Sequence, residues 1–596
     1  MSGSDAGSFR RSPAAASVIL AALIFAIACA ISALAPQYDV TLLVTVGLSA
    51  LAAMGLTLLL ISGQVSLGQA AFMAIGAYTS AILARDHGMP TLLALFAGVA
   101  ASAIGGAVVG AVTLRLKGHF LPLATLAIGI AISAAIVAAG SITGGASGLG
   151  QIPPLAIGPL VLTDDRVFAV LVWLMVAVLA GGLSRLLHTR TGRAIAALKS
   201  DSEMAEIFGV DAMRLRLMVF VMAATLAGLA GSLYAFYFKF LSPAPFGLTA
   251  SVNLLIASIF GGMGHPFGAV LGATAISVLE TALQNTVARM FGLSGHVEMI
   301  VFGLVLIGVL LRWPGGIWSA LERFWPKFTV AQPARHIELT PSKRGAEGEN
   351  LLSVSQIGKN FGGLQALQGV SFAVGADEIV GLIGPNGAGK STTFNIATGL
   401  VAPSKGTVLL MGEPPPARVS DLVDRGVSRT FQHVRVLPER TVLENVAFGA
   451  YAQGRSGMVF GMFGFDRVEE AATFAKAWRA LQIVELDGLA HEPASRLAMG
   501  QARLLEVARA LVSRPRLLLL DEPAAGLRTG EKLKLVTLLH RLKRGGMSVL
   551  LVEHDMDLVM NCVDRIVVLD RGQGLMTGLP DEVRADERVI AAYLGA

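Results

Sequence analysis

The segment at 384–391, GPNGAGKS, holds the residue types and spacing that point most directly to chemistry. It follows the apolar run EIVGLI and precedes STTFNIATGL, so it predicts a phosphate-binding loop between a strand and a helix. Glycine lets backbone N–H groups turn inward around a polyphosphate, and the helix N-terminus adds its positive dipole end. The lysine reaches the terminal phosphates, and the hydroxyl after it ligates Mg²⁺. The expected phosphate-binding residues are Gly384, Asn386, Gly387, Gly389, Lys390, Ser391 and Thr392, with Ser391 also a metal ligand.

Two later segments end in ionisable residues. RLLLLDEP is an apolar run that ends at Asp521 and Glu522, as a buried parallel strand does when it delivers acids to the ligand-binding edge of a sheet. We expect Asp521 to hold Mg²⁺ through water and Glu522 to polarise the attacking water. SVLLVEHD predicts a second such strand, which places the imidazole of His554 between the γ-phosphate and Glu522.

The composition places part of the chain in lipid. Of 596 residues, 54% are hydrophobic and 15% are charged, whereas an ordinary globular protein has roughly 25% charged residues. The net charge of +6 does not indicate a nucleic-acid partner, because the basic residues of the first half lie in short loops between apolar runs. Cys29 and Cys562 are too far apart in the sequence to suggest a disulfide framework or a zinc site.

Apolar runs of membrane-spanning length fill the first half of the chain. They lie at about 17–36, 40–62, 66–84, 90–113, 120–142, 166–187 and 216–241, followed by an interrupted region at 251–290 and a last run at about 297–312. Both the basic loops and the nucleotide-hydrolysing half must be cytoplasmic, so the number of crossings must be even. We expect eight or ten, with 251–290 either a re-entrant segment or a pair of short spans.

The domain boundaries follow from these patterns. Residues 1–330 are predicted to form the membrane domain, 331–350 a polar linker without hydrophobic periodicity, and 351–596 the nucleotide-binding domain. The start of the chain also has features of a secretory signal peptide, namely Arg10 and Arg11, an apolar run and a small-residue triplet. We expect an uncleaved first helix, because cleavage would remove one crossing.

Residues 351–596 resemble the ATP-binding cassette (ABC) ATPases in the order and spacing of five motifs. The resemblance implies that Phe361 in KNFGG stacks on adenine, and that Gln432 in RTFQHVRV contacts Mg²⁺ and senses the membrane partner. It also implies that LAMGQ closes on the γ-phosphate of ATP bound by an opposing ATPase, through Ala498, Gly500 and Gln501. With Gln432, the expected catalytic residues are Lys390, Glu522 and His554, with ATP and Mg²⁺ as cofactors. Two departures are Ala498, where many members have serine, and AAGL at 524–527 in place of SALD.

A narrower resemblance covers nearly the whole chain. RTFQHVRV, DEPAAGL, LVEHDMDLVM and VIAAYLG are similar to LivG, the ATPase subunit of branched-chain amino acid importers. GQVSLGQAAFMAIGAYTSA and ASIFGGMGHPFGAVLGA resemble the companion permease, LivM. The implied fold is a polytopic α-helical membrane domain fused to an α/β P-loop ABC ATPase. The implied function is ATP-driven import of branched-chain or related hydrophobic amino acids across the bacterial inner membrane.

The same resemblance predicts a short coupling helix around Glu203, Ala205 and Gly209 that docks beside the Gln432 loop. The alternative is an amphipathic loop that lies on anionic lipid. The implied partners are a LivH-like second permease, a LivF-like second ATPase and a periplasmic solute-binding protein, or else a second copy of the chain. Other functions left open are import of another small solute such as urea, an amide or an aromatic acid, a homodimeric exporter half, and a membrane-tethered ATPase that transports nothing.

Overall fold

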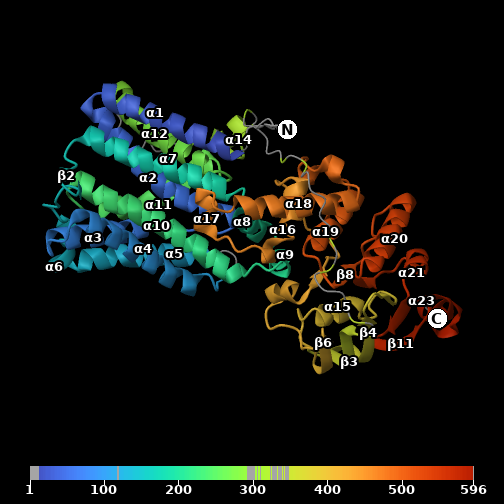
Figure 1. The fold of residues 1–596 in the computed structure, drawn as a ribbon. Coiled ribbons are helices and arrows are strands. Elements are labelled where there is room, and N and C mark those ends of the chain that lie inside the picture. The colour runs from blue at the N-terminus through green and yellow to red at the C-terminus, as the bar shows by residue number, and fades with distance from the viewer. Residues whose placement is uncertain are drawn as a thin grey trace, which may run out of the picture. The chain divides into compact units, whose positions relative to one another are not determined.

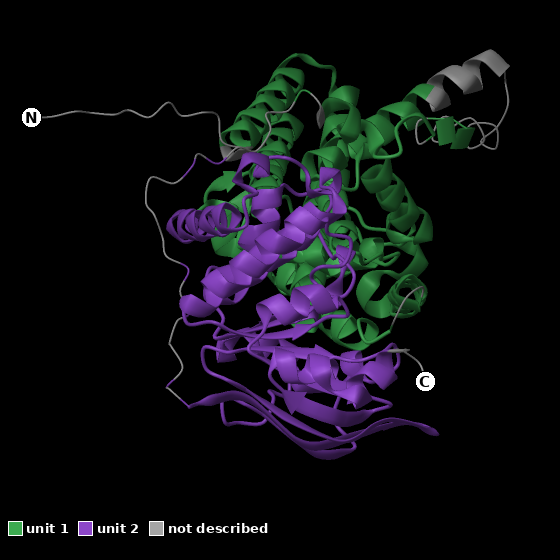
Figure 2. Ribbon diagram, turned by 90° about the vertical axis from the view of Figure 1, so that its right-hand side faces the viewer, with its two compact units in different colours: residues 1–199, 213–329, 458–464 green, residues 200–212, 330–457, 465–596 purple. Residues whose placement is uncertain are grey.

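The computed structural model describes residues 13–116, 120–291 and 348–594, together with short stretches between 303 and 346. By its contacts the chain forms two compact units (Figure 2). Unit 1 comprises residues 1–199, 213–329 and 458–464, and unit 2 comprises residues 200–212, 330–457 and 465–596. Each unit therefore contains one short segment that the sequence places in the other half. The predicted linker at 331–350 lies mostly outside the described residues.

Unit 1 is helical (Figure 1). Its helices are α1 (Pro13–Leu34), α2 (Gln37–Ile61), α3 (Gln69–Arg85), α4 (Thr91–Thr113), α5 (Phe120–Ala138), α6 (Gly140–Thr143), α7 (Asp165–Leu186), α8 (Arg190–Ser200), α10 (Ala212–Phe238), α11 (Leu248–Gly261), α12 (Pro266–Phe291), α14 (Gly316–Glu322) and α17 (Met458–Phe463). Two short 3₁₀ helices and a small hairpin connect them, namely η1 (Gly145–Ser147), η2 (Ala244–Phe246), β1 (Ala156–Ile157) and β2 (Leu160–Val161).

Helix α2 forms the centre of this unit. Its most apolar window is 89% buried, against 17% for α5 and 22% for α1, which expose apolar side chains at the periphery. A helix that is apolar on all sides is stable only when protein or lipid covers every face. Helix α1 packs along α7, and the guanidinium of Arg166 donates hydrogen bonds to the carbonyl groups of Ser32 and Ala33 at the end of α1 and of Ala35 just after it.

Among the described residues, six helices are long and apolar enough to cross a membrane, or up to seven if the bent α11–α12 pair counts as one span. This is fewer than the eight or ten predicted. Helix α3 occupies a predicted run but has only 17 residues, the lower limit for a helix that crosses a bilayer, and is not among the six. Most of the last predicted run, 297–312, lies outside the described residues.

The interrupted region behaves as its glycine and proline residues indicate. Helices α11 and α12 meet at an angle of 118° across a break at 262–265. Gly262 has φ +127°, a conformation that favours glycine, and Pro266 starts α12, where its missing N–H costs nothing. A broken segment of this kind is tolerated at membrane depth where protein or a polar pathway covers it.

Helix α10 packs closely against its neighbours at glycine residues. A Cβ atom added at Gly231 would collide with the carbonyl group of Met73 in α3, and one at Gly228 would collide with Ser102 in α4. Small residues at these positions let the backbones of neighbouring helices approach each other closely. Membrane helices associate through such close packing, because lipid provides no hydrophobic driving force between them.

Unit 2 contains two sheets. The six-stranded sheet has the order β11-β10-β5-β9-β8-β7, and all pairs are parallel except β10 with β11. Its strands are β5 (Ile379–Ile383), β7 (Val427–Arg429), β8 (Leu517–Asp521), β9 (Ser548–Val552), β10 (Arg565–Asp570) and β11 (Gln573–Gly578). The second sheet, of order β4-β3-β6, is antiparallel and consists of β3 (Asn350–Phe361), β4 (Leu364–Gly375) and β6 (Lys405–Leu410).

The helices of unit 2 are α9 (Ser202–Ile207), α15 (Lys390–Ala397), α16 (Val442–Phe448), α18 (Arg467–Ile483), α19 (Met499–Val512), α20 (Thr529–Arg544), α21 (Met556–Cys562), α22 (Pro580–Ala585) and α23 (Glu587–Leu594). Its 3₁₀ helices are η3 (Val419–Asp421), η4 (Val423–Arg425), η5 (Tyr451–Gln453), η6 (Asp487–Leu489) and η7 (Ala494–Arg496).

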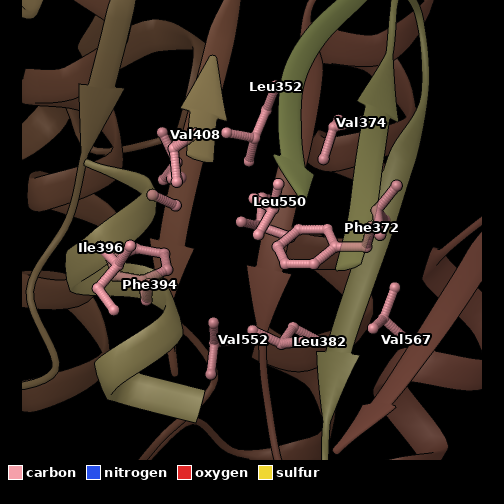
Figure 3. Packing of buried hydrophobic residues seen from close by; sticks show 14 of the residues in the cluster. Leu352, Phe372, Val374, Leu382, Phe394, Ile396, Val408, Leu550, Val552 and Val567 are labelled. Atoms are coloured by element: carbon pink, nitrogen blue, oxygen red, sulfur yellow. The ribbon is translucent and has the colours of Figure 1, made fainter. Parts of the chain in front are cut away.

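One hydrophobic core joins the two sheets of unit 2 to α15. Figure 3 shows Phe372 of β4 near Leu550 of β9, with Phe394 and Ile396 of α15 on the other side. Strands β5, β8 and β9 are buried along their whole length, as continuous apolar runs predict for a parallel sheet covered on both faces. The predicted fold class, a polytopic helical domain fused to an α/β nucleotide-binding domain, is confirmed.

Candidate nucleotide-binding and coupling site

The carboxyl ends of three neighbouring parallel strands bring the predicted nucleotide-binding residues together. Strand β9 lies between β5 and β8, so the loop after β5, Asp521 at the end of β8, and His554 just after β9 meet at one edge of the sheet. This edge is where open α/β sheets bind their ligands. The loop at 384–391 lies more than a hundred positions before Asp521 and His554 in the sequence.

The loop after β5 has the backbone of a phosphate-binding loop. Gly384, Gly387 and Gly389 have φ of +154°, +85° and +94°, values that favour glycine. A Cβ atom at Gly389 would lie 2.5 Å from Leu367 Cδ2, so space also demands glycine there. Asn386 and Gly387 are exposed at the tip of the loop. Ser391, which is exposed, and Thr392, which is partly buried, lie in the first turn of α15.

Lys390 is folded into this loop. Its ammonium group donates hydrogen bonds to the carbonyl oxygens of Gly384, at 2.7 Å, and Pro385, at 3.0 Å. Burial lowers the pKa of Lys390, while the carboxylates of Glu522 and Asp521 oppose this effect. Two neutral carbonyl groups do not compensate a buried positive charge fully, so the lysine is poised to pair with an anion such as a phosphate.

Asp521 and Glu522 follow the buried run of β8, as predicted. Burial raises the pKa of Asp521 to about 6, with Arg429 acting against this shift. Its Oδ1 atom is buried and has no hydrogen-bond partner among the described residues, which a bound cation or an ordered water would explain. This orphaned oxygen fits the predicted Mg²⁺ site. The described residues contain no cluster of three or more His, Cys, Asp or Glu side chains that would hold a metal without a phosphate ligand.

Glu522 has an unusual backbone. Its φ is +47°, in the left-handed region that non-glycine residues rarely adopt, and its N–H donates to the carbonyl of Val552 in β9, at 2.8 Å. Such strain persists where surrounding structure enforces it, and it clusters at functional sites. His554 Nδ1 lies 3.8 Å from Glu522 Oε2, beyond hydrogen-bonding distance, and the histidine side chain is 57% exposed.

Glu553 is a residue of this site that the sequence analysis missed. Its side chain is fully buried, its Oε1 accepts the N–H of Ala524 at 2.7 Å, and its Oε2 accepts the N–H of His554 at 3.1 Å. The carboxylate thus fixes the AAGL loop and the backbone that presents His554. The sequence offered one signal for Glu553, namely its position between a predicted strand and His554 in the run SVLLVEHD. The neighbouring residues, however, do not distinguish a buried glutamate from a solvent-exposed one.

The predicted signature segment begins helix α19. Ala498 is its N-cap residue and is exposed, Gly500 is buried, and Gln501 Oε1 accepts the N–H of Ala498 at 3.1 Å. Alanine cannot accept a hydrogen bond from the first turn, so one capping bond is missing. A Cβ atom at Gly500 would lie 3.0 Å from Glu531 Oε2 and Leu527 Cδ2, which holds α19 close to the AAGL loop and α20.

The two remaining predicted residues lie on exposed loops. Phe361 ends β3 with 49% of its surface exposed, and the ammonium of Lys359 lies 5.1 Å from the centre of its ring. An exposed aromatic side chain of this kind is available to stack on a planar base. Gln432 has an exposed side chain, and its carbonyl oxygen accepts a hydrogen bond from the guanidinium of Arg503 in α19.

A buried charge network ties α19 to the Gln432 loop. Arg503 donates to the carbonyl of Phe431 at 2.7 Å, Arg509 donates to the carbonyl of Arg435 at 2.7 Å, and Glu506 lies between the two arginines. Glu506 also accepts the N–H of Arg435 at 2.9 Å. A fixed link between the signature helix and this loop makes the two move as one body.

We expect Glu506→Gln to destabilise the chain by about 3–5 kcal/mol, because it leaves two buried guanidinium groups without their carboxylate. Glu492→Gln is the matched control, since Glu492 pairs with Arg496 in an ion pair whose side chains are 48% and 67% exposed. Surface pairs contribute about 0–1 kcal/mol. Thermal unfolding of the detergent-solubilised full chain checks this, and equal melting temperatures for the two variants would contradict the role assigned to Glu506.

Residues 200–212 pack within unit 2, on the ATPase sequence. The predicted short helix is present as α9, and Asp201 caps it by accepting the N–H of Met204 at 2.9 Å. The apolar side chains of this segment are at most 1% exposed at positions Met204, Ala205, Ile207, Phe208 and Val210. This burial disfavours the alternative of a loop that lies on lipid.

Four charged and aromatic contacts fix this segment beside the Gln432 loop. Arg435 bridges Asp201 and Glu203, each at 2.8 Å. The ring of Phe208 packs against Phe448, with 5.7 Å between centroids, and the guanidinium of Arg509 lies 5.0 Å from the centre of the Phe208 ring. The network that holds α19 therefore also contacts the segment that is continuous with the membrane helices.

Comparison with known proteins covers both halves of the chain. Residues 39–310 match the family described as branched-chain amino acid transport system/permease component, residues 367–525 match ABC transporter, and residues 575–596 match branched-chain amino acid ATP-binding cassette transporter.

Individual relatives match the ATPase half. A stretch of 251 residues is 43% identical to the high-affinity branched-chain amino acid transport ATP-binding protein LivG of Escherichia coli (strain K12), and it covers 41% of this chain and 98% of that protein. BraF of Pseudomonas aeruginosa matches with the same identity and coverage. A nucleotide-free ATP-binding cassette from an ABC transporter is 32% identical, with 41% of this chain and 100% of that chain covered and a TM-score of 0.37. The chain therefore belongs to the branched-chain amino acid ABC transporter family, as a permease fused to a LivG-like ABC ATPase whose ATP hydrolysis is coupled to transport.

Proposed function

We propose that this chain imports branched-chain or related hydrophobic amino acids across the bacterial inner membrane, with its ATPase on the cytoplasmic side. The observation that carries the proposal is the agreement of separate matches. The permease half, the last 22 residues and the 43%-identical relatives all belong to proteins described by branched-chain amino acid transport. Basic residues of α8, which follows α7, support the orientation; they include Arg190, Arg193 and Lys199.

The hydrolytic roles follow from the edge of the parallel sheet. Lys390 leaves the loop carbonyl groups to pair with the terminal phosphates of ATP, and the N-terminus of α15 contributes its positive dipole end. Glu522 orients and polarises the attacking water, and His554 stabilises the γ-phosphate charge that develops in the transition state. Phe361 stacks on the adenine base.

The metal ligands of this proposal are Ser391, Asp521 and Gln432. These three side chains would hold Mg²⁺, which would supply positive charge to neutralise the charge that develops on the phosphate. The unpaired Oδ1 of Asp521 supports this assignment, since a buried carboxylate oxygen without a hydrogen bond is costly unless an ion or water satisfies it. The exposed side chain of Gln432 is free to turn toward the site when the nucleotide enters.

The ATPase half supplies one phosphate loop and one signature segment. We infer that the composite site is completed by a second ATPase, because Ala498 and Met499 are exposed at the start of α19 and are available to a nucleotide on another chain. A LivF-like ATPase, a LivH-like permease and a periplasmic binding protein complete the complex, or two copies of this chain pair. Closure of the ATPases then moves the 200–212 segment and the membrane helices.

Uptake by the purified complex, reconstituted in sealed vesicles with its cognate binding protein, tests the substrate class. We expect accumulation of radiolabelled leucine that depends on ATP and exceeds that of urea. Accumulation of urea, an amide or an aromatic acid without leucine would replace the proposed substrate by one of the small solutes considered above. ATP-dependent loss of leucine from the vesicle interior would reverse the proposed direction.

We expect Ala498→Ser to raise both stability and turnover. A serine N-cap stabilises a helix by about 0.5–2 kcal/mol relative to alanine, and its hydroxyl offers the γ-phosphate a hydrogen bond. Ala498→Gly is the control, since glycine improves the cap slightly and has no hydroxyl. Melting temperature and ATP turnover of the complex separate the two effects. If serine and glycine raise turnover equally, the hydroxyl has no part in catalysis.

A further inference from the structure

Helix α17 (Met458–Phe463) comes from the ATPase half of the sequence but packs in the membrane unit, whose colour it has in Figure 2. It lies against the carboxyl end of α7. A Cβ atom at Gly182 of α7 would lie 3.3 Å from Met462 Cε, and one at Gly461 would lie 3.1 Å from Thr189 Oγ1. Helices α7 and α17 approach closely because each has a glycine at the contact, Gly182 in α7 and Gly461 in α17.

The place of α17 along α7 sets its depth in the bilayer. Helix α7 has 22 residues, which is about the length that crosses the hydrocarbon core of a membrane. Its last turn, near Gly182 to Leu186, must lie where the acyl chains meet the headgroups. Arg185 lies in this turn, and its guanidinium packs against Gly464, the residue after α17. A basic side chain at this level is favoured beside anionic headgroups.

Helix α17 is apolar on all sides, and its two sides differ in how much surface they expose. The side that faces α7 includes Met458 and Met462, which are 9% and 8% exposed. The opposite side presents Val459, Phe460 and Phe463, which are 57%, 58% and 57% exposed. A helix without a polar side needs apolar surroundings on every face.

We propose that the outer face of α17, formed by Val459, Phe460 and Phe463, inserts into the cytoplasmic leaflet and anchors this part of the ATPase sequence to lipid. Phenylalanine and aliphatic side chains bury at the headgroup–acyl boundary in interfacial helices of other proteins. The covered side of α17 meets α7 at Gly182, one turn beyond Val178, which is 51% exposed, and two turns beyond Leu174, which is 44% exposed. Lipid that covers that stripe of α7 continues onto α17.

This anchor goes beyond the proposed amino acid import and does not depend on the solute. Its consequence is mechanical. When the ATPases close, α17 stays with the end of α7 and with the leaflet, so the chain on either side of 458–464 must bend there.

Spin labels on the complete reconstituted complex test the proposal. In a background of C29A and C562A, a single cysteine replaces Phe460 or Phe463, and Val459→Cys serves as an independent position on the same face. Power saturation then compares collisions with oxygen, which concentrates in lipid, and with a water-soluble nickel chelate. Val178→Cys on α7 is the lipid reference, and Leu579→Cys, on a 57% exposed residue of the ATPase, is the aqueous reference.

We expect labels at 460 and 463 to show an oxygen-to-nickel collision ratio several-fold above that at 579 and close to that at 178. A ratio equal to that at 579 would place the face in water and overturn the proposal. Low collision rates with both reagents would mean that protein, such as a partner permease, covers the face, and would overturn it equally. ATP turnover of each labelled complex verifies that it is folded.

Discussion

Glu522→Gln is expected to lower ATP turnover by roughly 10²–10⁴-fold, the contribution typical of a positioned general base, and to stop solute accumulation. Glutamine keeps the size of the side chain and the strained backbone, which is held by the bond from the Glu522 N–H to Val552. It loses the negative charge that we propose polarises the attacking water, 3.8 Å from His554 Nδ1. Nucleotide binding is expected to persist, because Lys390 and the loop of glycines are unchanged. Turnover and nucleotide affinity of the purified complex measure the two effects separately.

The chain offers a matched control for this substitution. Glu485 also has a left-handed backbone, with φ +58°, but its side chain is exposed and pairs with Lys534. Glu485→Gln therefore repeats the loss of charge at a strained glutamate away from the sheet edge, and it should leave turnover unchanged. Normal accumulation by Glu522→Gln in sealed vesicles would show that ATP hydrolysis at this site does not drive transport.

Gly209→Ala is expected to reduce uptake more than it reduces ATP hydrolysis. Gly209 has φ +91°, and a Cβ atom there would lie 2.7 Å from the Cβ of Ala452. The left-handed conformation costs a non-glycine residue about 1–2 kcal/mol, and overpacking adds about 1–3 kcal/mol. The 200–212 segment would then leave its buried position against the ATPase. Uptake should fall by roughly tenfold or more, as a loss of at least 1.4 kcal/mol in docking implies.

Gly412→Ala separates backbone strain from collision. Gly412 has φ +82°, but a Cβ atom there would meet nothing within 4 Å, so the substitution adds strain without a clash. The ratio of solute transported to ATP hydrolysed, measured in the same vesicles, should fall for Gly209→Ala and stay normal for Gly412→Ala. An equal ratio for both variants would show that the packing of Gly209 on Ala452 does not transmit movement.

Short stretches of sequence were sufficient to predict the phosphate loop, the buried strands and the bend between α11 and α12. The glycine spacing of 384–391 requires backbone conformations that few residues adopt, and the structure has them at Gly384, Gly387 and Gly389. The apolar runs before Asp521 and His554 predicted buried strands, and β8 and β9 are buried throughout. The bend at 262–265 followed from glycine and proline in the same way. The count of crossings stays a prediction, because most of the last predicted run, 297–312, lies outside the described residues.

By itself, the sequence determined that one half of the chain lies in lipid and the other in water, since composition controls this directly. It also determined the loop, strands and acidic residues of the candidate nucleotide site, since these depend on short-range spacing. Only the tertiary structure decided the roles of Glu553 and Glu506, and the exchange by which 200–212 packs on the ATPase while α17 packs on α7. Those contacts join residues far apart in the chain, as Arg509 and Met204 are, 305 positions from each other. A buried carboxylate and a solvated one have the same local pattern, and the partner that distinguishes them is brought near only when the chain is packed.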